Sequence, residues 1–580
     1  MRLKRWIATG SAAGLLVLAA CGGNSDLESD TEDSINSQAA AGTGKDPDAE
    51  APAPEIEGAE EGGTLKVLST EGMNSIHPQD TYYYNTMSIT TGLMFRTLTQ
   101  YVERDGQMVL VPDLATDLGQ PNDDFTEWTF EIRDGVRWET GDEVTAEDVA
   151  RGIKASFDRD TFTAGPAYAN TYFEGGDSYK GLYSDPKTEP EAVSVDGNKV
   201  TIKMAKPFAD MDYFGALPAM SPLPDTNEDP ADYARHPLST GPYKIDSYNV
   251  GKKMTLVQND EWDPETDPGR HQYLDGYDFD LQIGDSGQIE NLILGDQGDA
   301  QTTVSIDNVN QANVAKAKEQ DQLVSGASAC GYFLNPDYRK VTDINIRKAI
   351  GLAFPYEDTW LAEGQIIGTT RAPATMISAP SVPGRIDPPY DVLGNKGQET
   401  DTAEAKKLLE KADAVGYELK FVYTSDDPML VDMKDAMVRS FEEAGFKVSP
   451  VKAADDQETS KINQDPDAPV NLRRTSWCAD WPSGAVWIPP VLSKAYPGSN
   501  YAHFTEPDVE KKIDEVQQLP SEDQAEAWAD LEKYAMEKYY PTIPIGYTGS
   551  AMLEGSRVEG MSVDEVFGNP TWKSMWISSE

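Results

Sequence analysis

The chain has 580 residues, of which 99 are acidic and 49 are basic, so its formal net charge at pH 7 is −50. Such an acidic balance argues against nucleic acid and other polyanions as partners. The length exceeds what one hydrophobic core usually organises, so two or three domains are expected.

The N-terminus is typical of a bacterial lipoprotein signal peptide, which we assign to residues 1–20. Basic residues precede an apolar run that ends in LAACG at positions 18–22. Small residues before a cysteine resemble a lipobox, so Cys21 is expected to carry the lipid that holds the protein on a membrane surface. The alternative is an ordinary secretory signal with a chance cysteine.

Residues 21–62 predict a disordered acidic tether. They consist of Ser, Ala, Gly, Pro, Asp and Glu with almost no large apolar side chains. Such a segment cannot offset its own ordering entropy. Its negative charge favours holding the folded body away from an anionic membrane surface.

The first half of the folded part is rich in paired strands. Residues 63–68 alternate and predict the first strand, and the apolar spacing in residues 88–98 predicts a helix. Thr145 begins a capping box that predicts a second helix. Turn sequences between alternating runs predict three hairpins, at 128–138, 193–204 and 241–258.

After Cys330 the pattern changes to helices that alternate with short strands. A strand at 419–423, a helix at 429–443 and a strand at 446–448 predict a βαβ unit. A pair of helices within residues 508–539 then precedes a final strand at 542–547.

No pattern in the sequence is typical of a metal, cofactor or catalytic site. The four histidines are scattered without ligand-like spacing, and no phosphate-binding loop, GxSxG motif or HExxH motif occurs. Besides Cys21, only Cys330 and Cys478 are present, which indicates either a disulfide or a free buried pair. We therefore expect no metal, no cofactor and no enzymatic activity.

Residues 474–482, with the sequence RTSWCADWP, combine an acid, a base, two indoles and a cysteine in one short segment. In a strand, alternate side chains share a face, so Arg474, Ser476, Cys478 and Asp480 would point the same way. The two charges would lie roughly 20 Å apart at about 3.3 Å per residue, which suits the ends of a short zwitterionic molecule. The alternative is that both are the solvated ends of a core strand.

Several segments together resemble one family, the extracytoplasmic solute-binding lipoproteins of peptide-type ABC importers. They follow the family's order and cover nearly all of the chain after residue 63: FEIRDGVRW at 130–138, TAEDV at 145–149, STGPYKI at 239–245, NDEW at 259–262, DINIRKA at 343–349, GFKV at 445–448 and ADW at 479–481. The resemblance implies an α/β fold of two hinged lobes with an extra antiparallel-rich domain, three domains in all.

The resemblance also implies where the domains divide, the first of them being discontinuous. Lobe I would consist of residues 63–100, 216–330 and 541–580. The extra domain would be residues 101–215. Lobe II, the mobile lobe, would be residues 331–540.

The same resemblance implies roles for residues of 474–482, which we call the central segment. Asp480 would bind a ligand's α-ammonium, and Arg474 would bind a short peptide's carboxylate, although neighbouring Arg473 could equally supply that base. Trp477 would line a side-chain pocket, and backbone groups of Ser476 and Cys478 would pair with the ligand as an added strand. Trp481, which stands where many relatives carry Tyr or Phe, completes the expected ligand-binding set. A disulfide between Cys330 and Cys478 is implied as well.

The predicted function is that of a lipid-anchored receptor on the outer face of the bacterial cytoplasmic membrane. It would capture oligopeptides between two closing lobes and deliver them to an ABC permease, as a monomer. The alternative is a receptor for another solute such as an oligosaccharide, because indoles at Trp360, Trp481 and Trp487 could stack on sugars. The sequence leaves open the ligand's length, its residue preference and the identity of the permease.

Overall fold

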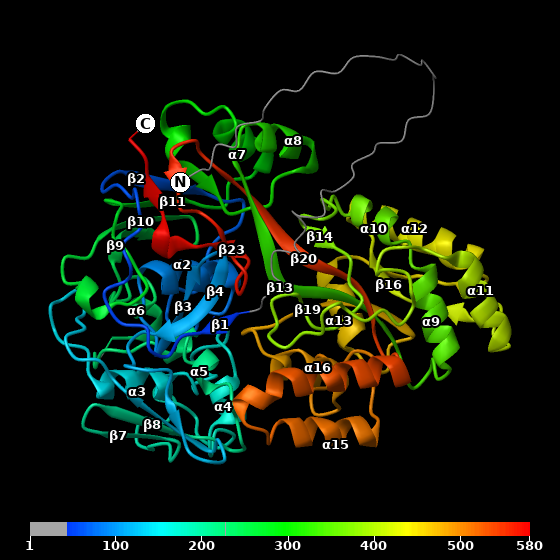
Figure 1. Cartoon of the computed structure of the whole chain (residues 1–580), viewed down its shortest axis with the longest axis horizontal. Helices are drawn as coiled ribbons and strands as arrows, with labels where there is room; N and C mark the ends of the chain where they lie inside the picture. The colour runs from blue at the N-terminus through cyan, green and yellow to red at the C-terminus, as the bar shows by residue number, and fades with distance from the viewer. Residues whose placement is uncertain (1–42, 227, 580) are drawn as a thin grey trace, which may run out of the picture.

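The computed structural model describes residues 43–226 and 228–579. The signal peptide, Cys21 and the tether as far as residue 42 lie outside this range. Figure 1 shows two bodies joined by two long strands, β13 (Leu323–Pro336) and β20 (Ile543–Glu554). One body contains both ends of the described chain, and the other consists mainly of the residues between these two strands. From here on, lobe I, the extra domain and lobe II denote the residue ranges given above.

A nine-stranded mixed sheet runs through both bodies. Besides β13 and β20 it contains β2 (Thr64–Leu68), β9 (Tyr243–Asn249), β10 (Lys253–Gln258), β11 (Gly276–Asp280), β12 (Thr303–Ser305), β14 (Arg371–Ala372) and β19 (Leu472–Cys478). The order is β19-β13-β20-β12-β2-β11-β10-β9, and β14 also pairs with β20. Since β13 and β20 are antiparallel neighbours that pass from one body to the other, they form the structural link between the lobes.

The extra domain contains a four-stranded sheet of β5 (Gln120–Pro121), β6 (Glu127–Glu131), β8 (Lys199–Lys203) and β7 (Val193–Asp196), in that order. The hairpins predicted at 193–204 and 241–258 are confirmed as β7–β8 and β9–β10. The hairpin predicted at 128–138 is wrong, because β6 pairs with β8 and β5. The alternation correctly indicated which side chains of β6 are buried, but it carried no information about the pairing partner.

A second small sheet has the order β1 (Gly44–Lys45), β4 (Gln107–Pro112) and β3 (Thr99–Arg104). The helices of lobe I and the extra domain are α2 (Tyr84–Leu93), α3 (Ala146–Ala155), α4 (Tyr168–Tyr172), α5 (Met211–Phe214), α6 (Pro230–Tyr233), α7 (Ser286–Ile293) and α8 (Gln311–Glu319). The predicted capping box is confirmed at the start of α3, where the hydroxyl of Thr145 accepts from the Asp148 amide and the Asp148 carboxylate accepts from the Thr145 amide.

Lobe II contains the predicted βαβ unit, in a doubled form. It consists of β15 (Glu418–Leu419), β16 (Val422–Thr424), α12 (Pro428–Glu443), β17 (Lys447–Val448) and β18 (Val451–Ala453). β15 lies parallel to β17, and β16 lies parallel to β18. The other helices of lobe II are α9 (Ile344–Ala353), α10 (Tyr356–Ala362), α11 (Thr402–Lys411), α13 (Asp456–Gln464), α14 (Ile488–Leu492), α15 (Pro507–Val516) and α16 (Ser521–Lys538).

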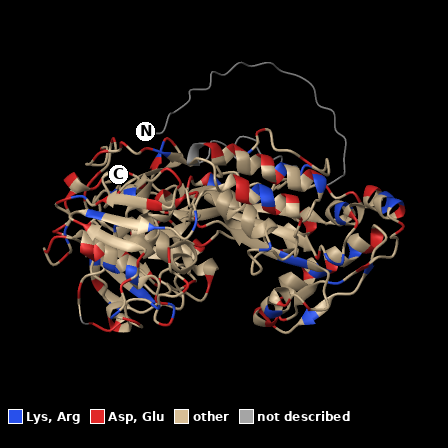
Figure 2. Ribbon diagram, turned by 90° about the horizontal axis from the view of Figure 1, so that it is seen from below, with Lys and Arg blue, Asp and Glu red and all other residues tan. Residues whose placement is uncertain are grey.

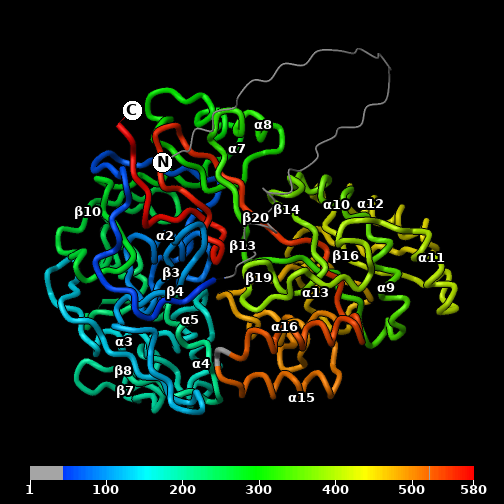
Figure 3. Tube along the Cα trace, in the orientation of Figure 1, coloured from blue at the N-terminus to red at the C-terminus, as the bar shows by residue number. Residues whose placement is uncertain are grey.

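The C-terminal segment returns to lobe I, as the red end of the tube in Figure 3 shows. It forms the short strands β21 (Val558–Glu559), β22 (Val563–Asp564), β23 (Asn569–Pro570) and β24 (Trp576–Ile577). In the ribbon of Figure 2, acidic residues are spread over both bodies.

The prediction of a disordered tether is wrong for residues 43–62, because these residues pack on the folded body. β1 adds to the edge of β4, the Ala53 amide donates to the Asp267 carbonyl, and the Ile56 amide donates to the Tyr273 hydroxyl. Composition predicted disorder because the segment has few large apolar side chains. Its order comes instead from backbone pairing and polar contacts, which composition does not reveal.

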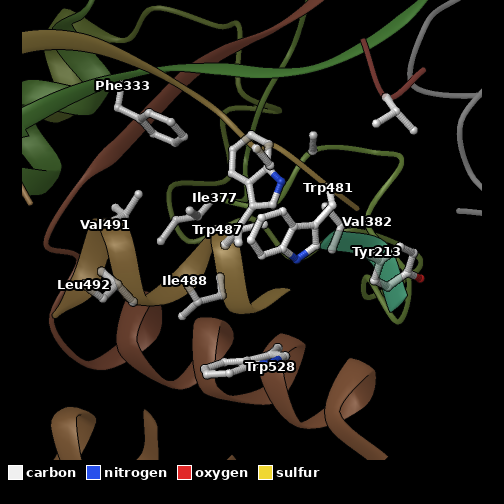
Figure 4. Packing of buried hydrophobic residues seen from close by; sticks show 14 of the residues in the cluster. Tyr213, Phe333, Ile377, Val382, Trp481, Trp487, Ile488, Val491, Leu492 and Trp528 are labelled. Carbon is white, nitrogen blue, oxygen red and sulfur yellow. The ribbon is translucent and has the colours of Figure 1, made fainter. Parts of the chain in front are cut away.

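One hydrophobic cluster continues across the place where lobe II meets the extra domain. Figure 4 shows Trp481, Trp487 and Val382 of lobe II gathered near Tyr213 of α5. Trp481 is fully buried there. The contact between lobe II and the extra domain is therefore partly apolar.

Candidate functional site

The central segment forms β19 and the short stretch that follows it. β19 pairs only with β13 and so forms one end of the nine-stranded sheet, and Cys478 lies directly opposite Cys330 in the register. The structure joins these two cysteines by a disulfide, with their Cα atoms 4.1 Å apart. The disulfide fixes the end of β19 at the point where β13 leaves lobe I.

Asp480 lies between the lobes rather than on an outer surface. Its carboxylate accepts a hydrogen bond of 2.8 Å from the hydroxyl of Tyr82, and the adjacent Ala479 carbonyl accepts one of 3.0 Å from the hydroxyl of Tyr84. Both tyrosines belong to lobe I. Only 7% of Asp480 is exposed, so this carboxyl is enclosed by groups from both lobes.

The carboxyl of Asp480 has no cationic partner within the described part of the chain. Burial raises its pKa to about 7, and the hydrogen bond from Tyr82 opposes that shift only in part. A buried carboxylate without a counterion is unfavourable in low dielectric. An ammonium group that entered this space would therefore be strongly attracted to it.

The two neighbouring arginines of β19 have different surroundings. Arg473 is fully buried, contacts Asp337, and donates to the backbone carbonyls of Asn463 and Asp465. These bonds give Arg473 a structural role inside lobe II. Arg474 instead lies over the ring of Tyr332, 4.6 Å from its centroid, and forms an ion pair with Glu363.

Arg371 is a basic residue of this site that sequence reasoning missed. Its guanidinium lies on the ring of Tyr332, 4.0 Å from the centroid, and within 3.7 Å of Glu363. It is 2% exposed, yet its Nε and Nη1 atoms have no hydrogen-bond partner among the described residues, and neither has Nε of Arg474. Two guanidiniums thus share one carboxylate and retain unpaired donors, which favours a further anion at this position.

The other expected residues are placed as follows. Ser476 is exposed on β19, and Trp477 is half-buried and donates from its indole to the Val486 carbonyl at 2.7 Å. Trp481 has no exposed surface, because its indole donates to Asp210 at 2.8 Å and packs against Phe214. The assignment of Trp481 to the ligand surface is therefore corrected: in this structure it joins lobe II to the extra domain.

The sequence contained a signal for the missed tyrosines. Tyr82, Tyr83 and Tyr84 form a run of three tyrosines that leads into α2, whose first residue is Tyr84. In the structure Tyr83 is 59% exposed, which is unusual for a large aromatic side chain. No signal marked Arg371, which reaches the site only because β14 pairs with β20.

A cavity of about 600 Å³ lies between lobe I, residues 53–56 and the start of the extra domain, and not around Asp480. Its walls include Ala53, Tyr101, Phe567 and Lys573. Phe567 also contacts the ring of Tyr84, with 6.1 Å between centroids, so the cavity approaches the lobe junction from one side. The functional site is better defined by the unpaired charged groups than by this cavity, because none of the expected site residues lines it.

The described residues contain no group of three or more His, Cys, Asp or Glu side chains arranged to hold a metal ion. None of their helices is both long enough and apolar enough to cross a bilayer.

Residues 109–498 match the model of the bacterial extracellular solute-binding proteins, family 5. The chain belongs to this family. It is a solute-binding protein of the peptide-importer type, and the members of this family are binding proteins rather than enzymes. The two-lobed α/β fold expected from the sequence is confirmed.

Three relatives illustrate the range of the family. The periplasmic oligopeptide-binding protein OppA of Salmonella typhimurium is 23% identical over 486 residues, which cover 79% of this chain and 83% of the relative. The nickel-binding periplasmic protein of Escherichia coli is 24% identical over 343 residues, covering 55% and 56% of the two chains. The solved structure of clavulanic acid biosynthesis oligopeptide binding protein 2 has a TM-score of 0.80 at 23% identity and covers 93% and 100%.

Proposed function

We propose that this family 5 protein captures short oligopeptides between its lobes, with Asp480 binding the peptide's α-ammonium. The observation that carries the proposal is the enclosed carboxyl of Asp480, which contacts lobe I through Tyr82 and has no cationic partner among the described residues. A bound ammonium would remove the cost of burying that charge. The gain is available only when both lobes surround the ligand.

The other end of the peptide would be held by Arg474 together with Arg371. Their unpaired N–H groups suit a carboxylate, which accepts several charge-assisted hydrogen bonds at once. We assign this role to Arg474 rather than Arg473, because the guanidinium of Arg473 is already occupied by Asp337 and backbone carbonyls.

Between these ends, the peptide backbone would add to the open edge of β19. This strand ends the nine-stranded sheet, and Ser476 at its middle is exposed. Backbone groups of Ser476 and Cys478 would pair with the ligand, and Trp477 would contact its side chains. Strand addition uses main-chain hydrogen bonds that every peptide offers, so it supports broad selectivity.

The family and the N-terminal sequence support a proposal for the wider role. Lipidated Cys21 would hold the receptor, as a monomer, on the outer face of the cytoplasmic membrane. Ligand contacts to both lobes would favour the closed arrangement, which would then dock on an ABC permease.

A receptor for an oligosaccharide is the alternative, and it requires indole surface in the site. Trp360, Trp481 and Trp487 suggested that surface in the sequence, but each is at most 2% exposed. Trp360 and Trp481 also use their indole N–H groups in internal hydrogen bonds. This burial favours the peptide proposal.

Native mass spectrometry of protein purified from its own host tests the proposal. We expect co-purified masses in the range of short peptides from the wild-type protein, and a loss of these masses from Asp480→Asn. The variant Asp564→Asn is a matched control, because Asp564 is another buried carboxyl with a raised pKa, of about 6, that lies in lobe I away from β19. Sugar masses, or peptide masses that persist in Asp480→Asn, would contradict the assignment.

A further inference from the structure

The first described residues of the chain contact both lobe II and the extra domain. The amide of Thr43 donates to the carbonyl of Ser381 in lobe II at 3.3 Å, while Gly44 and Lys45 belong to β1 on the other side of the junction. Thr43 and Ser381 are 5% and 2% exposed. In Figure 1, β1 lies at the boundary between the two bodies.

β1 is held on the edge of β4 by a parallel backbone pairing. Gly44 lies opposite Val109, Lys45 lies opposite Leu110, and the Asp46 amide donates to the Leu110 carbonyl at 2.9 Å. The carboxylate of Asp46 also forms an ion pair with Arg104 at 2.5 Å. This end of the segment therefore has several fixed contacts.

Lys45 adds a charged and an aromatic contact at the same place. Its ammonium lies 2.6 Å from the carboxylate of Asp212 and 4.0 Å from the centroid of the Tyr213 ring. Tyr213 belongs to the hydrophobic cluster that it shares with Val382 of lobe II, next to Ser381 in the sequence (Figure 4). The residues that hold Lys45 thus lie where the extra domain meets lobe II.

We propose that Thr43–Asp46 is a strap that binds the edge of β4 and the Asp212–Tyr213 pocket and ties the extra domain to lobe II through the amide of Thr43. Opening of the lobes must break the bond to Ser381 or pull β1 from β4. Each step costs hydrogen bonds, so the strap opposes opening. Because residues 21–42 precede it directly, the expected membrane tether joins the body at the lobe junction and not at a remote point of lobe I.

Hydrogen exchange of the ligand-free protein tests the strap. Opening exposes α5, which packs on Trp481 of lobe II, so exchange of its amides reports the opening equilibrium. Thr43→Pro removes the N–H that donates to Ser381 and should raise this exchange by about two- to tenfold. This factor corresponds to the net contribution of one hydrogen bond to stability. Thr43→Ala keeps the N–H and removes only a hydroxyl that has no partner in residues 43–226 and 228–579, so it should match wild type.

A second pair of variants tests the Lys45 contact. Lys45→Met should also raise exchange in α5, and Lys45→Arg should restore most of the protection. Lys253→Met removes a more exposed ion pair, to Asp280 at 3.2 Å on β10 and β11 of lobe I, and should leave α5 unchanged.

The strap proposal is overturned if the α5 amides exchange at the same rate in Thr43→Pro and Thr43→Ala. It is also overturned if faster exchange is confined to residues 43–62. Thermal unfolding of each variant separates opening from a general loss of stability: a fall in Tm with faster exchange in β10 would also overturn it. The measurement uses no ligand, so its result is independent of the proposed peptide binding.

Discussion

The two charged ends of the proposed site are held in contrasting ways. Asp480 is enclosed by tyrosines that come from the opposite lobe, and it has no counterion among the described residues. Arg371 and Arg474 lie together in lobe II, stacked on Tyr332 and partly neutralised by Glu363. The acidic end is therefore completed only when the lobes meet, whereas the basic end is formed within one lobe.

This difference indicates separate tasks. A preformed basic cluster can bind one end of a ligand in the open state, because it needs no contribution from lobe I. An ammonium bound at the acidic end would then stabilise the closed arrangement, since it would neutralise the buried charge of Asp480. The following changes test this division, from the largest expected effect to the smallest.

Asp480→Ala should cause the largest loss of peptide affinity. Truncation of one partner of a buried charge pair costs about 2–5 kcal/mol, which corresponds to a loss of roughly 30-fold to several thousand-fold. Calorimetry with the co-purified peptide measures the loss. An affinity within a few-fold of wild type would remove Asp480 from the site, provided that Asp564→Asn also binds normally.

The pH dependence of binding should be the next largest effect. Burial raises the pKa of Asp480 to about 7, so in the ligand-free protein the carboxyl is largely protonated below that value. Only the ionised form pairs with an ammonium, so affinity should fall by roughly tenfold or more between pH 7.5 and pH 5.5.

The raised pKa of Asp480 affects stability and peptide affinity in opposite directions as the pH rises. A carboxyl whose folded pKa exceeds its unfolded value lowers stability as the pH rises from about 4 to about 7. Asp480→Asn should therefore unfold at a higher Tm than wild type at pH 8 without ligand, and it should abolish the pH dependence of binding. A pH dependence that persists in this variant would assign the titration to another group.

Arg371→Met and Arg474→Met should each weaken binding by roughly tenfold, less than the loss at Asp480. Each removes charge-assisted hydrogen bonds worth about 1.5–3 kcal/mol, but the remaining guanidinium still attracts the carboxylate. A peptide with an amidated C-terminus provides the control, since its affinity should change little in either variant. Arg473→Met should instead lower Tm, because it removes a fully buried guanidinium that contacts Asp337 and donates to the carbonyls of Asn463 and Asp465.

The sequence predicted local features and the acidic end better than it predicted the contacts between distant segments. The capping box at Thr145 and the βαβ unit depend on near neighbours, and family resemblance placed Asp480 at the lobe junction. Tyr82 lies 398 positions before Asp480, and no local pattern links them. Trp481 was assigned to the ligand because an aromatic side chain suits either a ligand surface or a core, and only its contacts decide between them.

Tyr82→Phe should have the smallest effect and separates the two roles of the acidic end. The substitution removes the 2.8 Å hydrogen bond from lobe I but keeps the carboxyl and the aromatic ring. Since that bond lowers the pKa of Asp480, its loss should move the midpoint of the binding pH profile upward. At pH 8.5, where the carboxyl is largely ionised in both proteins, the affinity should fall by only a few-fold, in line with about 1 kcal/mol for one hydrogen bond. If the midpoint stays in place while affinity falls equally at every pH, Tyr82 acts on the ligand and not on Asp480, and the acidic end does not depend on lobe I in the way described.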